Sequence, residues 1–100
     1  MTDVIIDLGN ASNGDTDVAK GDQVTFRNTM NNRSVTLVLP RNQGGNSPFS
    51  GNPTSPVTLR AGDSSSRYTI NAGANGDYSY SWTVERDASA APRTGRIVVG

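Results

Sequence analysis

Residues 76–99, GDYSYSWTVERDASAAPRTGRIVV, come closest in this sequence to the frame of a chemical site. A strand with alternating aromatic residues, a loop, and a closing strand that begins at a glycine could together hold a metal ion. A transition-metal site needs soft thiolate or neutral imidazole ligands. This segment offers Trp82 and Glu85 instead, and the whole sequence has no Cys and no His. We therefore predict no metal, no cofactor and no disulfide.

Catalytic chemistry is poorly supported by the remaining polar residues. The only glutamate, Glu85, is followed by Arg86 and Asp87. Acid–base work by two carboxylates requires that they be held close together with separated pKa values, and nothing in the sequence indicates this. The serines have no histidine to act as their base, and Lys20 lies in a turn beside Gly21. We predict no catalytic residue and expect that the protein is not an enzyme.

The segment DLGNASNGDTD, residues 7–17, is rich in oxygen ligands of the kind that calcium prefers. Its spacing does not match an EF-hand loop, and Asn and Asp are common in turns because their side chains hydrogen-bond to the local backbone. Turn chemistry is therefore the favoured interpretation, and a weak hard-cation site between Asp7 and Asp17 is the alternative.

The elements that would carry these loops are predicted to be strands. A chain of 100 residues with 33% hydrophobic residues and 11 glycines is typical of one β-rich domain, here spanning residues 1–100. Apolar and polar residues alternate repeatedly, which predicts about eight strands and no helix. The residues expected to face the core are Val4, Ile6, Leu8, Val24, Phe26, Val35, Leu37, Leu39, Tyr78, Tyr80, Trp82, Val84, Ile97 and Val99.

Two further segments connect the strands. Residues 57–63 and 65–70 are predicted to form a hairpin-like pair around the turn Ala61-Gly62-Asp63. Residues 41–56, RNQGGNSPFSGNPTSP, show no periodicity and form a long loop with Phe49 as its anchor. Its glycines lack the strand-to-helix context and the lysine of a phosphate-binding loop. Tight turns combined with one long crossover predict an all-β Greek-key sandwich.

Three segments in this order resemble the cupredoxins, the plastocyanin and azurin superfamily: VAKGDQVTFRN at 18–28, LRAGDSSSRYTI at 59–70, and GDYSYSW with the terminal GRIVV. The resemblance implies a cupredoxin-like sandwich. It also implies that the copper ligands of that family, two His, one Cys and a weak axial Met, would fall at Ser34, Glu85, Trp82 and Arg93. All four ligands are replaced, so the resemblance points to a scaffold without copper or electron transfer.

An immunoglobulin-like sandwich is the alternative fold. That fold also places a tyrosine two residues before a buried core position, a pattern that Tyr80 and Trp82 fit.

The function predicted from these observations is a non-enzymatic protein-binding or structural module that acts through end loops or sheet edges, with another protein or further copies of itself as partner. Met, Arg and aromatic residues are enriched at protein interfaces. The candidate contact residues, all in loops, are Met30, Asn31, Asn32, Arg33, Phe49, Arg86, Pro92 and Arg93. The alternative is a small-ligand or carbohydrate-binding domain in which Tyr78, Tyr80 and Trp82 would present a stacking face.

Charge and hydropathy limit the partners and leave the compartment open. Nine basic and nine acidic residues cancel, so we predict neither nucleic-acid binding nor membrane insertion. The N-terminal residues MTDVIIDLGN lack the charged lead and long apolar centre of a signal peptide. The expectation is a cytoplasmic protein, or an extracellular or periplasmic one if a signal was removed.

Overall fold

The computed structural model describes residues 2–10, 12–51, 53–86 and 91–100. Within these ranges the chain forms eight strands and no helix, which confirms the all-β prediction. The strands are β1 (Asp3–Asp7), β2 (Asp15–Val18), β3 (Gln23–Arg27), β4 (Val35–Arg41), β5 (Val57–Leu59), β6 (Tyr68–Thr69), β7 (Gly76–Val84) and β8 (Arg93–Val99).

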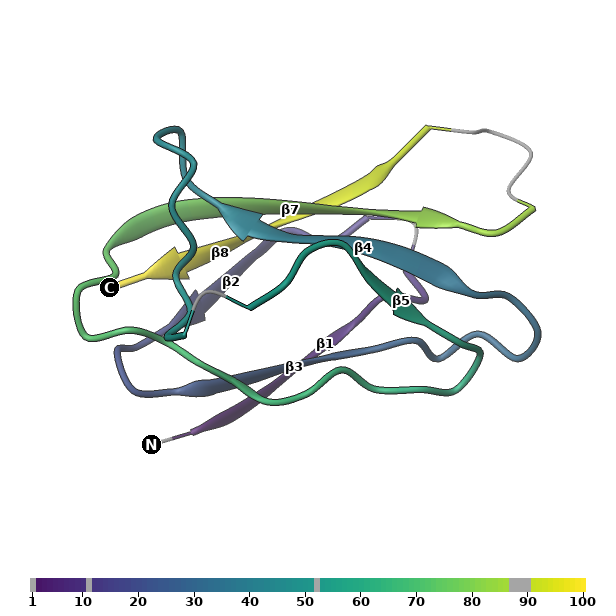
Figure 1. Ribbon diagram of the computed structural model, residues 1–100, viewed down its shortest axis with the longest axis horizontal. Coiled ribbons are helices and arrows are strands. Elements are labelled where there is room, and N and C mark those ends of the chain that lie inside the picture. Colours follow the sequence, from purple (N-terminus) through teal and green to yellow (C-terminus); the bar gives the residue numbers. More distant parts are fainter. Residues whose placement is uncertain (1, 11, 52, 87–90) are drawn as a thin grey trace.

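Two sheets pack face to face as a sandwich (Figure 1). The smaller sheet has the order β1-β3-β6 and the larger has the order β2-β8-β7-β4-β5. β1 runs parallel to β3, and β2 runs parallel to β8, whereas the other pairs are antiparallel. The two-layer sandwich is thus confirmed, and its description as a Greek key stays a prediction.

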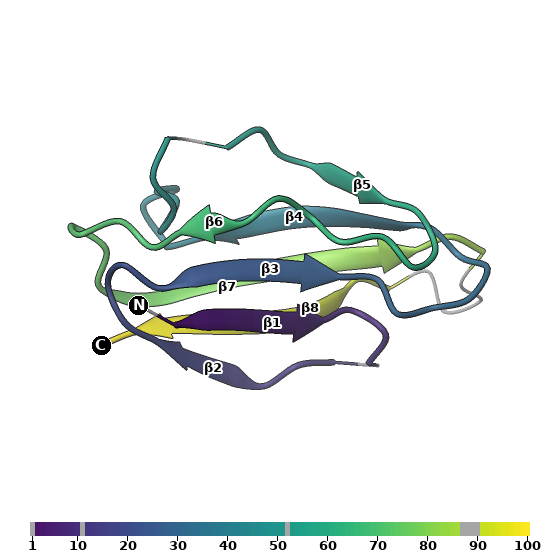
Figure 2. The same cartoon turned by 90° about the horizontal axis from the view of Figure 1, so that it is seen from below.

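The hairpin predicted for residues 57–70 is wrong. β5 pairs with β4 in the larger sheet, and β6 pairs with β3 in the smaller one. The turn at Ala61-Gly62-Asp63 therefore carries the chain from one sheet to the other (Figure 2). Alternation of apolar residues places each segment with one face in the core, but it does not determine which sheet each segment joins.

The core lies between the sheets and consists mainly of residues that the alternation selects, together with Phe49, Leu59, Ile70 and Ala74. Val4, also expected to face inward, is only half-buried and packs against this core. β7 shows the pattern most clearly, because its side chains at Tyr78, Tyr80, Trp82 and Val84 are all buried. The rings of Phe26 and Tyr80 meet edge to face with centroids 5.3 Å apart, and Tyr80 stacks on Trp82 at 5.7 Å. Aromatic pairs of this kind contribute roughly 1 kcal/mol each beyond the area they bury, so this row joins the two sheets.

The Tyr80 side chain also packs over Gly95 of β8. Its hydroxyl accepts a hydrogen bond of 3.1 Å from Asn13 Nδ2, and burial raises its pKa despite that bond. Gly95 lies opposite Tyr80 in the β7–β8 register. A Cβ at position 95 would collide with the Tyr80 ring and hydroxyl and with the Asn13 side chain, so a glycine is required there for packing.

We therefore expect Gly95→Ala to lower the free energy of unfolding by about 1–3 kcal/mol, because the buried ring opposite it cannot move away freely. Urea denaturation followed by Trp82 fluorescence would measure the change. Gly14→Ala is the matched control, since a Cβ at position 14 meets nothing within 4 Å. Equal stability of the two variants would contradict this view of the β7–β8 contact.

Candidate functional site

Three connecting segments meet at one end of the sandwich. They are the β3–β4 loop at 28–34, the turn at 60–63 after β5, and the described parts of the β7–β8 connection at 85–86 and 91–92 (Figure 1). We call these residues, together with Arg93, the loop end. Glu85 N donates to Ser34 O at 2.9 Å, which joins the first and third segments directly.

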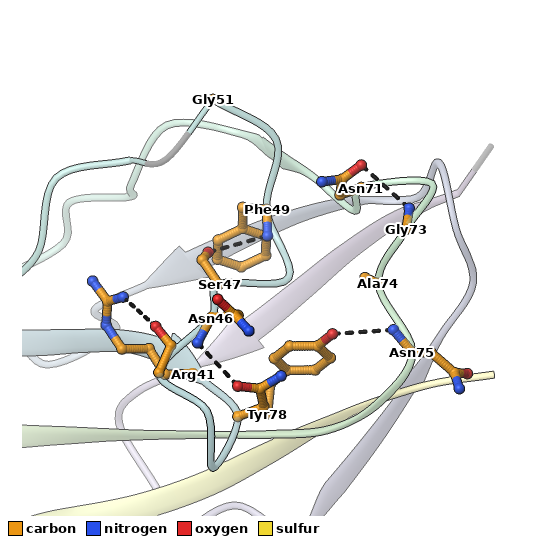
Figure 3. Close-up of a pocket in the computed structure, with 12 residues that line it drawn as sticks. Arg41, Asn46, Ser47, Phe49, Gly51, Asn71, Gly73, Ala74, Asn75 and Tyr78 are labelled. Carbon is orange, nitrogen blue, oxygen red and sulfur yellow. Dashed lines mark hydrogen bonds between the residues drawn. The ribbon is translucent and has the colours of Figure 1, made fainter.

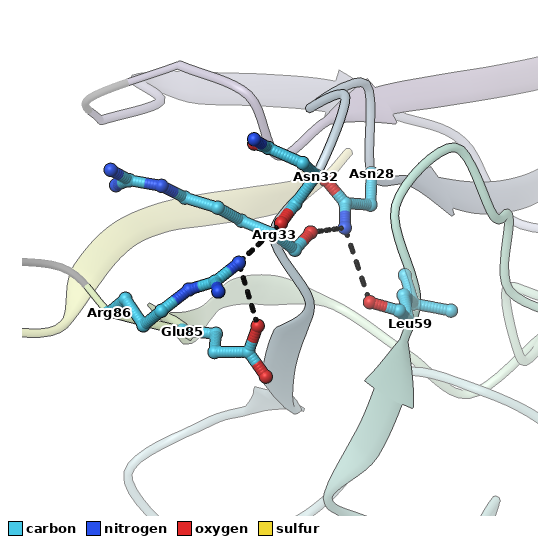
Figure 4. A network of polar contacts seen from close by, with 6 residues as sticks. All are labelled: Asn28, Asn32, Arg33, Leu59, Glu85 and Arg86. Atoms are coloured by element: carbon cyan, nitrogen blue, oxygen red, sulfur yellow. Dashed lines mark hydrogen bonds and ion pairs between the residues drawn. The ribbon is translucent and has the colours of Figure 1, made fainter.

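Asn28 holds two of these segments together from within. Its side chain is fully buried, and it is the one buried polar or charged residue found in the described ranges. Its Nδ2 donates to the carbonyl oxygens of Arg33 at 2.8 Å and Leu59 at 3.2 Å (Figure 4). It also donates to the carbonyl oxygen of Arg60 at 3.2 Å. Two amide hydrogens serve three carbonyls, so one hydrogen is shared between two acceptors.

The other polar groups of Asn28 are satisfied as well. Its Oδ1 accepts from Met30 N at 3.1 Å, and its backbone N donates to Asp63 O at 2.8 Å. A single buried side chain thus fixes the backbone of the β3–β4 loop against the turn that follows β5. In this loop the side chains of Asn31, Asn32 and Arg33 are exposed, whereas Met30 and Ser34 are half-buried.

Arg86 makes the corresponding connection from the third segment. Its backbone has a positive φ of 61°, a conformation that a non-glycine residue rarely adopts and that concentrates at functional sites. Its guanidinium donates to Asn32 O at 2.7 Å and lies 3.4 Å from Glu85 Oε1 (Figure 4). The Arg86 and Glu85 side chains are 67% and 52% exposed, so solvent screens this ion pair and it adds little stability.

The predicted contact residues separate into two groups. Asn31, Asn32, Arg33, Arg86 and Pro92 are exposed at the loop end. Met30 is half-buried and packs against the core. Arg93 is half-buried and donates to Asn10 O at 3.1 Å. Residues 87–90 of the same connection lie outside the described residues.

The assignment of Phe49 to the contact surface needs correction. Its side chain is only 2% exposed, and its ring stacks on Tyr68 with centroids 4.8 Å apart and meets Phe26 at 6.3 Å. An isolated bridge between Phe49 and Ile70 fixes the backbone as well. Phe49 anchors its loop, as the sequence also indicated, and cannot reach a partner.

Arg60 belongs to the loop end and was missed by the sequence reasoning. It is exposed, and its carbonyl accepts from both Asn28 Nδ2 and Asp63 N. The sequence did predict a turn at Ala61-Gly62-Asp63. Because that turn was assigned to a hairpin, it was not expected to lie at the same end of the sandwich as residues 28–34. With Arg33 and Arg86, the loop end presents three exposed guanidinium groups.

The four positions singled out by the resemblance to cupredoxins lie in two pairs and carry no ligand set. Ser34 and Glu85 are joined through their backbones, and Trp82 lies opposite Arg93 in the β7–β8 register. The indole of Trp82 is 1% exposed, and its Nε1 finds no hydrogen-bond acceptor in the described part of the chain. No group of three His, Cys, Asp or Glu residues that could hold a metal ion occurs among the described residues.

Turn and cross-strand hydrogen bonds occupy several polar groups of the described residues 7–10 and 12–17. Asp7 Oδ1 accepts from Gly9 N at 2.7 Å and from Thr29 Oγ1 at 2.6 Å. Asp15 receives two bonds from Arg96, at 2.9 and 2.8 Å, and this hydrogen bonding lowers the pKa of its carboxyl group. Local and cross-strand bonding therefore accounts for Asp7 and Asp15, and a weak hard-cation site in this segment stays a prediction.

Comparisons with known proteins bear on the fold alone. No known family and no curated protein matches the sequence. Among solved structures, the chain is similar to the cysteine protease inhibitor EhICP2 from Entamoeba histolytica, with a TM-score of 0.56 and 10% sequence identity over 99% of this chain and 96% of that one.

That inhibitor is an immunoglobulin-like β-sandwich, so the likeness agrees with the alternative fold considered above. The resemblance to cupredoxins stays a prediction. No helix in the described ranges is long and apolar enough to cross a membrane.

We expect Asn28→Ala to lower the free energy of unfolding by about 2–4 kcal/mol, because three carbonyls and one amide would lose their common partner. Chemical denaturation would measure the loss. Asn31→Ala is the control, since the exposed Asn31 side chain should change stability by no more than about 0.5 kcal/mol. A wild-type unfolding curve for Asn28→Ala would show that this amide does not hold the loops together.

Proposed function

We propose that this chain is a non-enzymatic module that binds another protein through its loop end. The observation that supports the proposal most strongly is the combination of a fixed backbone and exposed side chains at 28–34, 60–63 and 85–86. Asn28 and Arg86 tie these segments to one another through backbone carbonyls. Binding then requires little further ordering of the loops, which reduces its entropic cost.

The exposed side chains suggest the chemistry of the partner. Arg33, Arg60 and Arg86 carry guanidinium groups to the surface, and arginine is the cation best suited to interface ion pairs because its planar fork can bind a carboxylate with two hydrogen bonds. Met30, half-buried beneath them, adds a flexible apolar contact. Because Asp63 and Glu85 are exposed at the same end and Glu85 lies beside Arg86, the complement proposed for this end is an acidic patch that meets Arg33 and Arg60.

A cysteine protease is the first partner to test, with papain as the probe. The structural neighbour is described as a cysteine protease inhibitor and matches nearly the full length of this chain. A sequence identity of 10% supports a similar fold but not a shared partner. Self-association through the loop end is therefore tested in parallel.

The aromatic row of β7, formed by Tyr78, Tyr80 and Trp82, cannot bind a sugar by stacking. The side chains of Tyr78, Tyr80 and Trp82 are 4%, 2% and 1% exposed, so none offers a face for stacking. These residues alternate in register with Val84, which is also buried, and this alternation in the sequence already predicted that they face the core.

The proposal predicts that Arg33→Glu weakens binding to papain, or self-association measured by analytical ultracentrifugation, by about tenfold or more, as expected for loss and reversal of an interface charge. Papain binding is measured by titrating inhibition of its peptidase activity. Arg67→Glu is the matched control because Arg67 is also exposed but lies between β5 and β6, outside the loop end.

Two results would count against the proposal. One is an equal effect of both charge reversals, which would place the contact elsewhere or make it nonspecific. The other is a protein that stays monomeric at high concentration and does not bind papain.

A further inference from the structure

A cavity of about 820 Å³ lies at the opposite end of the sandwich from the loop end. One wall is the first part of the β4–β5 loop, from Asn42 to Gly51, and the other is the turn from Asn71 to Asn75 that leads into β7 (Figure 3). Its volume is within the usual range for small-molecule sites. The cavity is separate from the loop end, and the protein-binding role proposed above does not use it.

The two walls are fixed to one another by backbone hydrogen bonds. Ser50 N donates to Thr69 O at 2.9 Å, and Asn71 N donates to Pro48 O at 2.8 Å. Phe49 and Ile70 form a bridge between them, and the buried ring of Phe49 anchors this part of the loop in the core. The cavity is therefore preformed, which favours binding of a small ligand without reorganisation.

Amide groups surround the opening. Asn42 Oδ1 accepts from Asn46 N at 2.9 Å, and Asn71 Oδ1 accepts from Gly73 N at 3.3 Å, so both side chains are oriented by the walls (Figure 3). The Nδ2 groups of Asn42, Asn46 and Asn71 donate to no acceptor in the described part of the chain. Asn42 and Asn71 are thus oriented donors beside the cavity, and the exposed side chain of Asn46 is a third donor at its rim.

The floor of the cavity is less accessible than its rim. Phe49, Ala74 and Tyr78 are 2%, 4% and 4% exposed, so little apolar surface is available to a ligand. The Tyr78 hydroxyl accepts from Asn75 N at 3.0 Å, which leaves its own hydrogen for donation. A lipid or a flat aromatic ligand gains its affinity from apolar contact area and would find little here.

Charge excludes other ligand classes. Arg41, whose Nη1 donates to Gly45 O at 2.9 Å, is the only charged residue among the described lining residues. A polyphosphate needs several cations or an amide nest, and a metal ion needs carboxylates or imidazoles. A ligand rich in hydroxyl groups, each of which both donates and accepts hydrogen bonds, matches a rim of side-chain amides.

We propose that this cavity binds a saccharide. Asn46 and Asn71 donate to ring or hydroxyl oxygens from opposite walls, and Tyr78 donates from the floor. Arg41 lies at the edge, where it would favour a sugar that carries a carboxylate. The proposal is independent of the protein-binding role, because it concerns the other end of the sandwich and different residues.

The test is a titration of ¹⁵N-labelled protein with maltose, cellobiose, lactose and galacturonate, followed by two-dimensional NMR. We expect at least one sugar to cause saturable shifts of the Asn46, Asn71 and Gly73 signals, with a dissociation constant of about 1 mM, the strength that a few net hydrogen bonds provide. Asn46→Ala should weaken that binding about fivefold, and Asn71→Ala should do so to a similar degree. Asn31→Ala, at the loop end, should bind as the wild type does.

Three outcomes would overturn the proposal. The first is the absence of saturable shifts with all four sugars up to about 50 mM, well above a millimolar dissociation constant. The second is wild-type affinity in both Asn46→Ala and Asn71→Ala, provided that their spectra show the native fold. The third is saturable binding whose shifts fall at residues 28–34 rather than around the cavity.

Discussion

The buried amide of Asn28 is the constraint on which the arrangement of the loop end depends. An unpaired polar group in a protein interior costs more than a formed hydrogen bond contributes. The side chain can therefore be buried only where Arg33, Leu59 and Arg60 supply carbonyl oxygens to it. The same requirement couples a loop that follows a strand of the smaller sheet to a turn that follows a strand of the larger sheet.

The sandwich beneath this network provides a rigid support. β7 contributes an unbroken row of buried side chains, and Phe26 on the facing sheet packs edge to face against Tyr80 in that row. Side chains at the two ends of the sandwich can therefore differ in chemistry without altering the core. One end carries arginines on a backbone fixed by Asn28, and the other carries asparagines around a preformed cavity.

The sequence allowed the core to be predicted because alternation is a local property. A strand with one buried face shows it directly, and each residue expected to face inward on β3, β4, β7 and β8 is buried. Pairing between sheets is not local. Residues 57–63 and 65–70 resemble two arms of a hairpin, yet they pair with β4 and β3 in different sheets.

The candidate site was predictable only in part for the same reason. Arg33 and Arg86 could be named because each lies in a loop between two predicted strands. Placing Arg60 at the loop end would have required knowing that the chain crosses from one sheet to the other after β5. Phe49 was correctly expected to anchor its loop, but its burial against Tyr68 depends on a partner about twenty residues away in the chain. The cavity between residues 42–51 and 71–75 is formed by contacts between segments about twenty residues apart in the chain, so no local sequence pattern predicts it.

Backbone ¹⁵N relaxation of the free protein tests most directly whether the loop end is ordered before it meets a partner. If Asn28 and Arg86 fix the loops as described, the amides of 29–33 and 61–63 should have order parameters of about 0.85, close to those of β7. Values below about 0.6 in these segments, beside a rigid β7, would show that the loops move freely and would contradict a preorganised binding end.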